Sequence, residues 1–232
     1  MKRFFVLMMS FFAVGGCGGG GSTPRPPSPL TVYIALGDSV SASPNVNPNV
    51  VESWPFLLGT KINATSVQDL AVNSATIETV LGQEIPQISP AATLVTLMVG
   101  ANDFARMAPS TDMSEFRLKY QQALVSIHTR VPAARIVLVN EVNVTFLPCC
   151  SAQQFAPLGP TFIAGNRAID SFYPQYTVVD IACNPGSYNP SFYPQSDVHP
   201  NQAGHDQLAS LVYEYLLGNG AAPQTTCPPY MQ

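Results

Sequence analysis

The tripeptide Gly37-Asp38-Ser39 constrains this chain more than any other feature, because it directly follows the apolar run Val32–Leu36. Such a run is typical of a buried strand, and a Gly at its end permits a tight turn. A turn of this kind can hold a Ser hydroxyl at the edge of a sheet, where a substrate can reach it. The tripeptide alone is weak evidence, since Gly, Asp and Ser are ordinary turn residues.

Three further polar segments follow the tripeptide in order and strengthen this interpretation. They are Asn73-Ser74-Ala75-Thr76, Gly100-Ala101-Asn102-Asp103 and Asp197-Val198-His199-Pro200-Asn201. A Ser hydroxyl becomes a useful nucleophile only beside a base, and the tetrahedral oxyanion that it forms needs hydrogen-bond donors. The four segments together offer a nucleophile, oxyanion donors and an acid–base pair.

Apolar runs alternate with helical patterns along the rest of the chain. Strands are predicted at Val32–Leu36, Val67–Ala71, Thr93–Val99, Ile136–Val142 and Thr177–Ile181, and helices from Ser53, at Thr76–Gln83, from Asp112 to about Thr129, at Pro160–Phe172 and at Asn201–Leu217. This alternation predicts an α/β fold whose parallel sheet is covered on both sides. The functional crevice of such a sheet lies at the carboxyl ends of its strands, where Ser39, Ser74 and Asn102 are expected.

His199 is the candidate base among the three histidines. It lies in a Pro- and Asn-containing turn before the last predicted helix, which suits a residue that must reach across the sheet edge. His128 lies late in an amphipathic helix and is expected at the surface. His205 follows Gly204 and is expected to pack or cap.

The N-terminus has the features of an export signal. Lys2 and Arg3 precede the apolar stretch Phe4–Val14, which is too short to span a membrane as a mature helix. The stretch ends in Val14-Gly15-Gly16-Cys17, which resembles a bacterial lipobox. We therefore predict a lipoprotein signal peptide at residues 1–16, lipid on Cys17, a Gly/Pro/Ser-rich tether at 17–30, and an exported protein anchored in the membrane and facing the periplasm or the cell exterior. An ordinary secretory signal with a coincidental Cys is the alternative.

Charge excludes one class of partner. The chain has 10 Lys and Arg against 14 Asp and Glu, a net charge of −4. Nucleic-acid binding, which needs a basic face, is therefore not expected. No metal or nucleotide motif is present, so no cofactor is expected either.

The four segments resemble those of the GDSL, or SGNH, hydrolase superfamily, whose name lists Ser, Gly, Asn and His. The resemblance covers nearly all of Thr31–Leu217 and extends to Ser53-Trp54-Pro55 and Ala203-Gly204-His205. It implies one hydrolase domain at 31–218, followed by a tail at 219–232. The implied fold is a three-layer αβα sandwich with a parallel, flavodoxin-like five-stranded sheet. The implied roles are Ser39 as nucleophile, His199 as base and Asn102 as oxyanion donor, with no metal.

Two positions depart from the family pattern. Ser74 stands where the family usually has Gly, so the second oxyanion donor would be the Ser74 backbone N–H. If the family conformation there requires a positive φ, Ser is strained where Gly is not. The family acid usually lies three residues before the His, at Ser196 here, whereas Asp197 lies two before it. Asp197 is the expected acid; a Ser–His pair without it, or Asp180 in its place, are the alternatives.

Four cysteines remain beyond Cys17, namely Cys149, Cys150, Cys183 and Cys227. An even number in an exported chain favours disulfides, and the spacing fits no common zinc pattern. Neighbouring cysteines rarely bridge each other, so we expect bonds from Cys149 and Cys150 to Cys183 and Cys227. The family topology makes the bond to Cys183 the more secure, because it places the fourth and fifth strands side by side.

These observations predict a serine esterase that hydrolyses acyl or acetyl esters through an acyl-enzyme and a Ser39–His199–Asp197 triad. The oxyanion hole would be formed by Ser39, Ser74 and Asn102. Small-molecule, lipid and acylated-glycan esters are all compatible substrates. Two alternatives stay open: an O-deacetylase of envelope polysaccharide, and a non-catalytic envelope-binding lipoprotein with the same fold.

Overall fold

The computed structural model describes residues 31–42, 52–108, 111–150, 155–224 and 226–227. The signal and tether predicted at 1–30, including Cys17, lie outside these residues. The strands are β1 (Val32–Gly37), β2 (Ser66–Asp69), β3 (Leu94–Met98), β4 (Arg135–Val139) and β5 (Thr177–Val179). The α-helices are α1 (Ser39–Ala42), α2 (Trp54–Lys61), α3 (Ile77–Thr79), α4 (Ala101–Arg106), α5 (Ser114–Arg130), α6 (Gly159–Asp170) and α7 (Gln202–Leu216).

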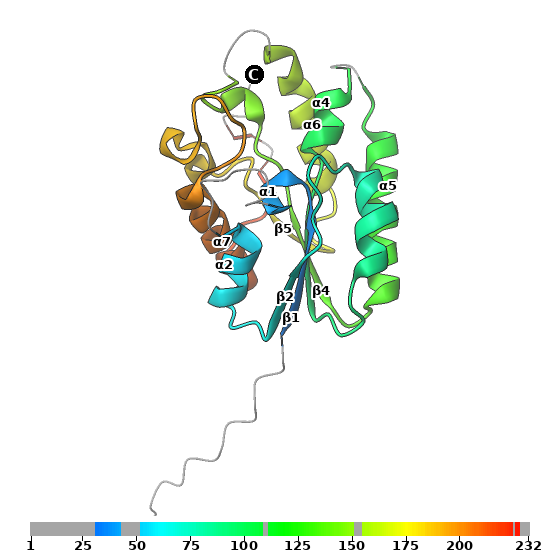
Figure 1. The fold of residues 1–232 in the computed structure, drawn as a ribbon. Coiled ribbons are helices and arrows are strands. Elements are labelled where there is room, and N and C mark those ends of the chain that lie inside the picture. Colours follow the sequence, from blue (N-terminus) through cyan, green and yellow to red (C-terminus); the bar gives the residue numbers. More distant parts are fainter. Residues whose placement is uncertain (1–30, 43–51, 109–110, 151–154, 225, 228–232) are drawn as a thin grey trace, which may run out of the picture.

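The strands form one five-stranded sheet in the order β2-β1-β3-β4-β5, and all four pairings are parallel. Helices lie on both faces of this sheet, with α2 and α7 on one side and α5 and α6 on the other (Figure 1). The predicted three-layer αβα sandwich with a parallel, flavodoxin-like sheet is confirmed.

Alternating side chains of the central strands pack in two separate hydrophobic cores, one on each face of the sheet. Ile34 and Leu36 of β1 face the core beneath α5 and α6, which also contains Phe104, Phe116 and Phe162. Tyr33 and Ala35 of the same strand face the core beneath α2 and α7. Burial on both faces explains why the strands read as continuous apolar runs rather than as alternating ones.

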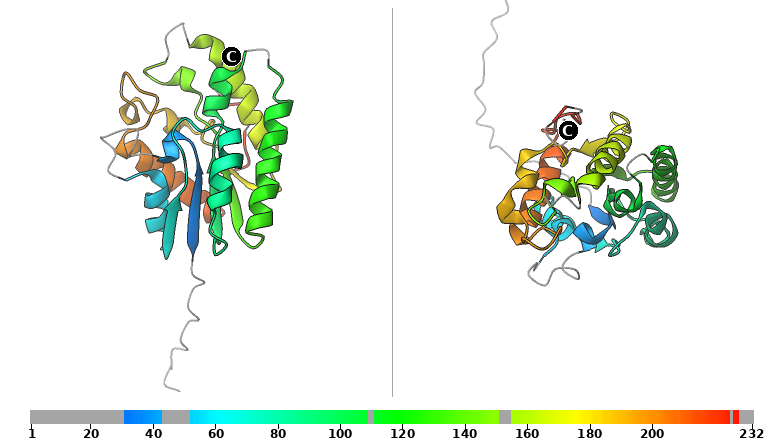
Figure 2. Two further views of the ribbon diagram at one scale, coloured as in Figure 1. Left: turned by 45° about the vertical axis from the view of Figure 1, so that its right-hand side comes forward. Right: turned by 90° about the horizontal axis from the view of Figure 1, so that it is seen from above.

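The carboxyl ends of β1 and β3 each continue into a short helix that the sequence did not predict. α1 follows β1 and α4 follows β3, and both lie above the same end of the sheet (Figures 1 and 2). Gly37 and Gly100 make the two turns with φ of 151° and 149°. Only Gly adopts such a conformation readily, so both Gly residues are needed for these strand-to-helix turns.

The helix predicted at Thr76–Gln83 is less regular than expected. α3 is followed by a π-helical turn at Val80–Glu84 and a 3₁₀ turn at Ile85–Gln87. Pro86 has no backbone N–H to donate to an α-helical partner, which accounts for the change of winding and for the end of the helix. Glu84 is thereby turned inward and fully buried.

The predicted disulfide pairing is wrong. The structure joins Cys149 to Cys150 and Cys183 to Cys227, so all four cysteines are bonded but not as expected. Gln224 N donates to the Asp180 carboxylate at 2.8 Å, which returns the tail to the end of β5 and brings Cys227 within 5.4 Å of Cys183 between Cα atoms. Although both loops follow neighbouring strands, Cys150 lines the pocket that contains Ser39, whereas Cys183 packs against Cys227 and Ala182.

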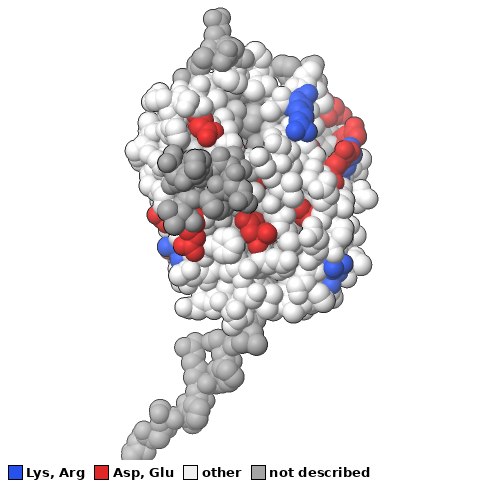
Figure 3. Space-filling model, in the orientation of Figure 1, with Lys and Arg blue, Asp and Glu red and all other residues white. Residues whose placement is uncertain are grey.

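Charged side chains are sparse on the surface, and most of the face seen in Figure 3 is formed by uncharged residues. None of the helices in the described part of the chain has the length and apolar character that crossing a bilayer requires.

Gly37→Ala is expected to destabilise the fold severely. A Cβ there would lie 2.1 Å from the Met98 carbonyl oxygen of the neighbouring strand, at a φ of 151°. Backbone strain and a forced strand displacement together should lower the free energy of unfolding by more than about 3 kcal/mol. Urea unfolding measures this change.

Gly82→Ala is the matched control, because a Cβ there meets nothing within 4 Å. Its stability should equal or slightly exceed that of the parent. Equal stability in the Gly37 and Gly82 variants would contradict the assigned geometry of the β1 turn.

Candidate active site

Ser39 is the first residue of α1 and is held at the carboxyl end of β1 by the turn before it. Asp38 N donates to the Met98 carbonyl at 3.1 Å, so the turn remains attached to β3. The Asp38 carbonyl accepts from Ser41 N and Ala42 N at 3.1 and 2.9 Å, which starts the helix. Ser39 is thus carried by the strand end itself and not by a long loop.

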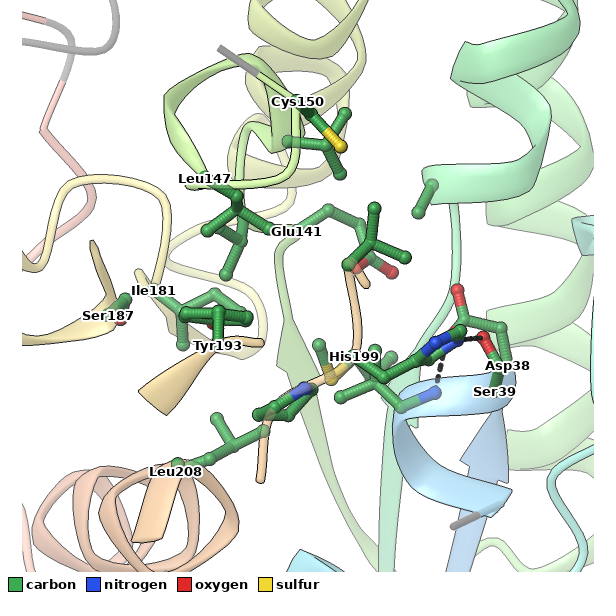
Figure 4. Close-up of a pocket in the computed structure, with 18 of the residues that line it drawn as sticks. Asp38, Ser39, Glu141, Leu147, Cys150, Ile181, Ser187, Tyr193, His199 and Leu208 are labelled. Atoms are coloured by element: carbon green, nitrogen blue, oxygen red, sulfur yellow. Dashed lines mark hydrogen bonds between the residues drawn. The ribbon is translucent and has the colours of Figure 1, made fainter. Parts of the chain in front are cut away.

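Ser39, His199 and Asp197 form one continuous chain of hydrogen bonds. The Ser39 Oγ lies 2.8 Å from His199 Nε2, and the Asp197 carboxylate lies 2.6 Å from His199 Nδ1. Figure 4 shows the His199 ring beside Ser39 at the edge of a pocket. A carboxylate can only accept, so Nδ1 carries the ring proton and Nε2 is free to accept from the hydroxyl. The structure therefore brings together three residues that the sequence assigned to one site.

Asp197 reaches the ring although it lies only two residues before His199. Its Oδ1 also accepts from the His199 backbone N–H at 3.1 Å, closing a turn in which one carboxylate oxygen contacts both backbone and ring. Ser196, at the usual family position, is exposed. Asp180 is committed elsewhere, since its carboxylate accepts from Asn140, Cys183 N and Gln224 N.

Ser74 and Asn102 also line the pocket that contains Ser39. Ser74 has a φ of 62°, the left-handed conformation that Gly adopts without strain, so the family's preference for Gly has a direct cause here. Asn102 Nδ2 donates to the Ala75 carbonyl at 3.0 Å, which fixes the amide beside the segment of Ser74. The Asp103 carboxylate accepts from Ile77 N at 3.2 Å and ties the same two segments together. Burial raises the pKa of Asp103 to about 6.

Glu84 supports the Ser39 turn through Gly37 and was not predicted from the sequence. It is fully buried, and its Oε2 accepts from Gly37 N at 2.8 Å. Burial raises the pKa of Glu84 to about 8 and that of the neighbouring Asp38 to about 7. The only sequence signal for Glu84 was that an acid stands among apolar residues (Val80, Leu81, Ile85), which is uncommon.

Glu141 is the second acid that the sequence did not single out. It directly follows β4 and Asn140, is only 2% exposed and lines the same pocket as Ser39. Its backbone is held by Asn166, which accepts from Glu141 N at 2.8 Å and donates to Glu141 O at 2.7 Å. Its carboxyl accepts from the backbone N–H of Ala101, the first residue of α4.

The two flanking motifs noted in the sequence meet in the structure. His205 Nδ1 accepts from Trp54 N at 3.3 Å, and Trp54 Nε1 donates to Ser41 Oγ at 3.2 Å. Burial lowers the pKa of His205 to about 4, so this imidazole is a neutral packing residue, as expected. His128 lies exposed in the last turn of α5, also as expected.

The pocket itself encloses about 270 Å³ and is apolar away from the hydrogen-bonded residues. Its walls come from the segment after β4 and from the segments before and within α7. They include Val142, Val144, Leu147, Cys150, Phe155, Leu158, Ile181, Phe192 and Leu208. Within the described ranges, no group of His, Cys, Asp and Glu residues is arranged to hold a metal ion.

A parallel αβα sandwich with a Ser at the end of β1 and a His–Asp pair before the last helix defines a serine-hydrolase type of site. The chain matches the family model described as GDSL-like Lipase/Acylhydrolase over residues 35–207, and it belongs to that family. It is therefore a serine hydrolase of ester bonds.

Solved structures with the same fold are similar over most of the chain. An extracellular lipase from Streptomyces rimosus has 16% identity and a TM-score of 0.61, over 82% of this chain and 100% of its own. A phospholipase A1 from Streptomyces albidoflavus has 16% identity and a TM-score of 0.59 over the same shares. The lipase Lip_vut3 from a goat rumen metagenome has 16% identity and a TM-score of 0.61, over 85% and 100%. Comparison with curated proteins gives no match.

Glu84→Gln should flatten the pH dependence of stability. The pKa of Glu84 is raised from 4.5 to about 8, so the folded state binds this proton more tightly than the unfolded state does. Stability from this group is therefore complete below about pH 4.5 and falls as pH rises through 8, by on the order of a few kcal/mol. Urea unfolding at pH 5 and pH 8.5 measures the loss.

The Gln side chain keeps an acceptor for Gly37 N and cannot ionise. The loss of stability between pH 5 and pH 8.5 should accordingly be smaller in Glu84→Gln than in the parent. An identical loss in both proteins would show that Glu84 does not titrate in this range.

Proposed function

We propose that this protein is a serine esterase that cleaves carboxylic esters through an acyl-enzyme formed on Ser39. The observation that carries the proposal is the continuous chain from Ser39 Oγ to His199 Nε2 and from His199 Nδ1 to Asp197, at 2.8 and 2.6 Å. This arrangement links a hydroxyl to a base whose ring is oriented by a carboxylate.

In the acylation step, His199 Nε2 takes the proton of Ser39 while Oγ attacks the ester carbonyl. The imidazolium that forms is stabilised by Asp197, and the same proton passes from Nε2 to the departing alkoxide. In deacylation a water molecule takes the place of the hydroxyl. His199 then removes the water proton and returns it to Ser39 Oγ as the acid leaves.

The negative charge on the carbonyl oxygen needs donors near Ser39. The candidates are the backbone N–H groups of Ser39 and Ser74 and the side-chain amide of Asn102. The support for this assignment is local: all three residues line one pocket, and the Ala75 and Ile77 hydrogen bonds hold the segments of Ser74 and Asn102 against each other. Ser can serve in place of Gly because the donor is the backbone.

The shape of the pocket favours esters with an aliphatic acyl chain over acetylated polysaccharide. Its cavity of about 270 Å³ extends from Ser39 between mainly apolar side chains. An apolar wall rewards burial of methylene groups and offers few partners to sugar hydroxyls. The acyl chain is therefore proposed to occupy this pocket.

The proposed location is the outer side of a bacterial membrane, with lipid on Cys17. The support lies in the sequence alone: a basic start, a short apolar stretch and Gly15-Gly16-Cys17. A tether at 17–30 would then separate the catalytic domain from the bilayer.

Ser39→Ala should abolish both ester hydrolysis and labelling by a fluorophosphonate probe, because it removes the only proposed nucleophile. Mass spectrometry of the labelled parent should place the adduct on Ser39. Retention of the native unfolding midpoint in the variant is the control for folding. A probe adduct in Ser39→Ala would move the nucleophile to another residue.

Asp197→Asn should lower kcat by roughly 100- to 10,000-fold, because an amide at this position disfavours the productive His tautomer and cannot stabilise imidazolium. Ser196→Ala is the matched control at the usual family position and should change kcat by less than about 3-fold. Steady-state hydrolysis of p-nitrophenyl butyrate measures both. Full activity in Asp197→Asn would favour a Ser39–His199 pair acting without the acid.

Cys17→Ser should release the protein from the membrane fraction, because Ser lacks the thiol to which the expected lipid would be attached. Esterase activity per mole should equal that of the parent, since Cys17 lies outside the catalytic domain. Detergent partitioning and mass spectrometry of the N-terminus report the result. An unmodified Cys17 in the parent would remove the basis for anchoring.

A further inference from the structure

Asp38 and Glu141 are the two acidic side chains that line the pocket among the described residues, and Glu141 is the one that does not belong to the Ser39 turn. It is 2% exposed, and its Oε1 has no hydrogen-bond partner among the described residues. A buried carboxyl oxygen without a partner is costly, so each one calls for an explanation, and at Glu141 the pocket beside it offers room for a ligand. In Figure 4 the Glu141 side chain projects between His199 and Leu147, within the pocket.

Glu141 lies near the part of the pocket where the ester carbonyl of a substrate would bind. Its carboxyl accepts from the N–H of Ala101, the residue before Asn102. After burial, Asp38, the residue before Ser39, is the largest cause of the raised pKa of Glu141. Glu141 is therefore bonded to the residue next to the proposed oxyanion donor, and it lines the same pocket as the proposed nucleophile.

The groups facing Glu141 are acids and phenols. Asp38 and Asp103 raise the pKa of Glu141 further, after burial as the main cause, and Glu141 in turn raises the pKa values of Tyr120 and Tyr193. No Lys or Arg is among these neighbours in the described structure. With its pKa held well above the usual range, Glu141 keeps its proton and offers an O–H donor as well as an acceptor.

We propose that Glu141 is a specificity-determining residue that hydrogen-bonds a hydroxyl group close to the ester carbonyl, so that 2- or 3-hydroxyacyl esters are preferred over plain acyl esters. This inference rests on the proposed esterase function. A hydroxyl on one of the first carbons of the acyl chain would satisfy the unpartnered oxygen, while the rest of the chain contacts the apolar wall. A plain chain would bury Glu141 with that oxygen unsatisfied.

The test compares ethyl butyrate, ethyl 2-hydroxybutyrate and ethyl 3-hydroxybutyrate in a pH-stat assay at pH 7. The parent should hydrolyse at least one hydroxylated ester with kcat/KM on the order of 10-fold or more above that of ethyl butyrate, the range expected when a buried polar group gains its partner. A parent without this preference overturns the inference, whatever the variants do.

Two substitutions separate substrate recognition from a structural role. Glu141→Gln keeps an acceptor for Ala101 N and a donor for the substrate, so it should retain the preference within about 3-fold. Glu141→Met fills the space without a polar atom and should remove the preference. Equal losses on all three esters in Glu141→Met would mean that Glu141 only positions α4, and would overturn the inference.

Val142→Ala is the control for a general change of the pocket, because Val142 is the apolar neighbour of Glu141 in the same wall. It should leave the ratio between hydroxylated and plain esters unaltered. Fluorophosphonate labelling separates a failure of the proposed esterase function from a failure of the proposed role of Glu141. A parent that neither labels nor cleaves any ester refutes the proposed function, whereas a parent that labels and cleaves without preference refutes only the role of Glu141.

Discussion

Buried carboxyl groups that accept hydrogen bonds from backbone N–H groups hold together the end of the sheet at which the candidate active site lies. The chain leaves β1 and β3 in tight turns, and the N–H groups in and near those turns are buried or partly buried. Glu84 accepts from Gly37 N, Asp38 from Val40 N, and Asp103 from Ile77 N. Glu141 does the same for Ala101. Without these acceptors the turns would bury unsatisfied donors, and Ser39 would lose its fixed position.

The same arrangement determines the electrostatics around the proposed nucleophile. Burial raises the pKa values of Asp38 and Glu84 to about 7 and 8, so these groups carry protons through much of the neutral range. Several ionised acids so close to Ser39 would oppose the negative charge that develops on the ester oxygen. Asp197 differs from them because it is partly exposed and contacts the His199 ring, where a carboxylate stabilises the imidazolium. The degree of burial thus distinguishes Asp38 and Glu84, which support the turn, from Asp197, which is placed to act in catalysis.

The alternation of strands with helices and the polar segments behind the strands were predictable from local patterns, whereas the flavodoxin-like sheet was implied by the resemblance to the family. Val32–Leu36 and Thr93–Val99 are continuous apolar runs, and in a parallel sheet their carboxyl ends must meet. Asp197 was predictable as well, although its contact with His199 Nδ1 depends on a turn that the sequence allows but does not require. Contacts made by residues outside these motifs were not predictable. Glu84 enters the site because Pro86 changes the winding of its helix, and Cys227 meets Cys183 because Asp180 holds the returning tail.

The proposed chemistry and the proposed selectivity therefore belong to different parts of the chain. Ser39 lies two residues after the end of β1 and Asn102 four residues after the end of β3, and the pairing of β1 with β3 leaves both segments little freedom. The far wall of the pocket is built by loops, namely the segment after β4 with the Cys149–Cys150 disulfide and the segment after β5 with the Cys183–Cys227 disulfide. Glu141 lies at the boundary, directly behind β4 yet facing the apolar wall. Because Glu141 accepts from Ala101 of α4 and not from the Ser39 turn, an exchange that keeps this acceptor, such as Glu141→Gln, can alter the contact to substrate without moving the nucleophile.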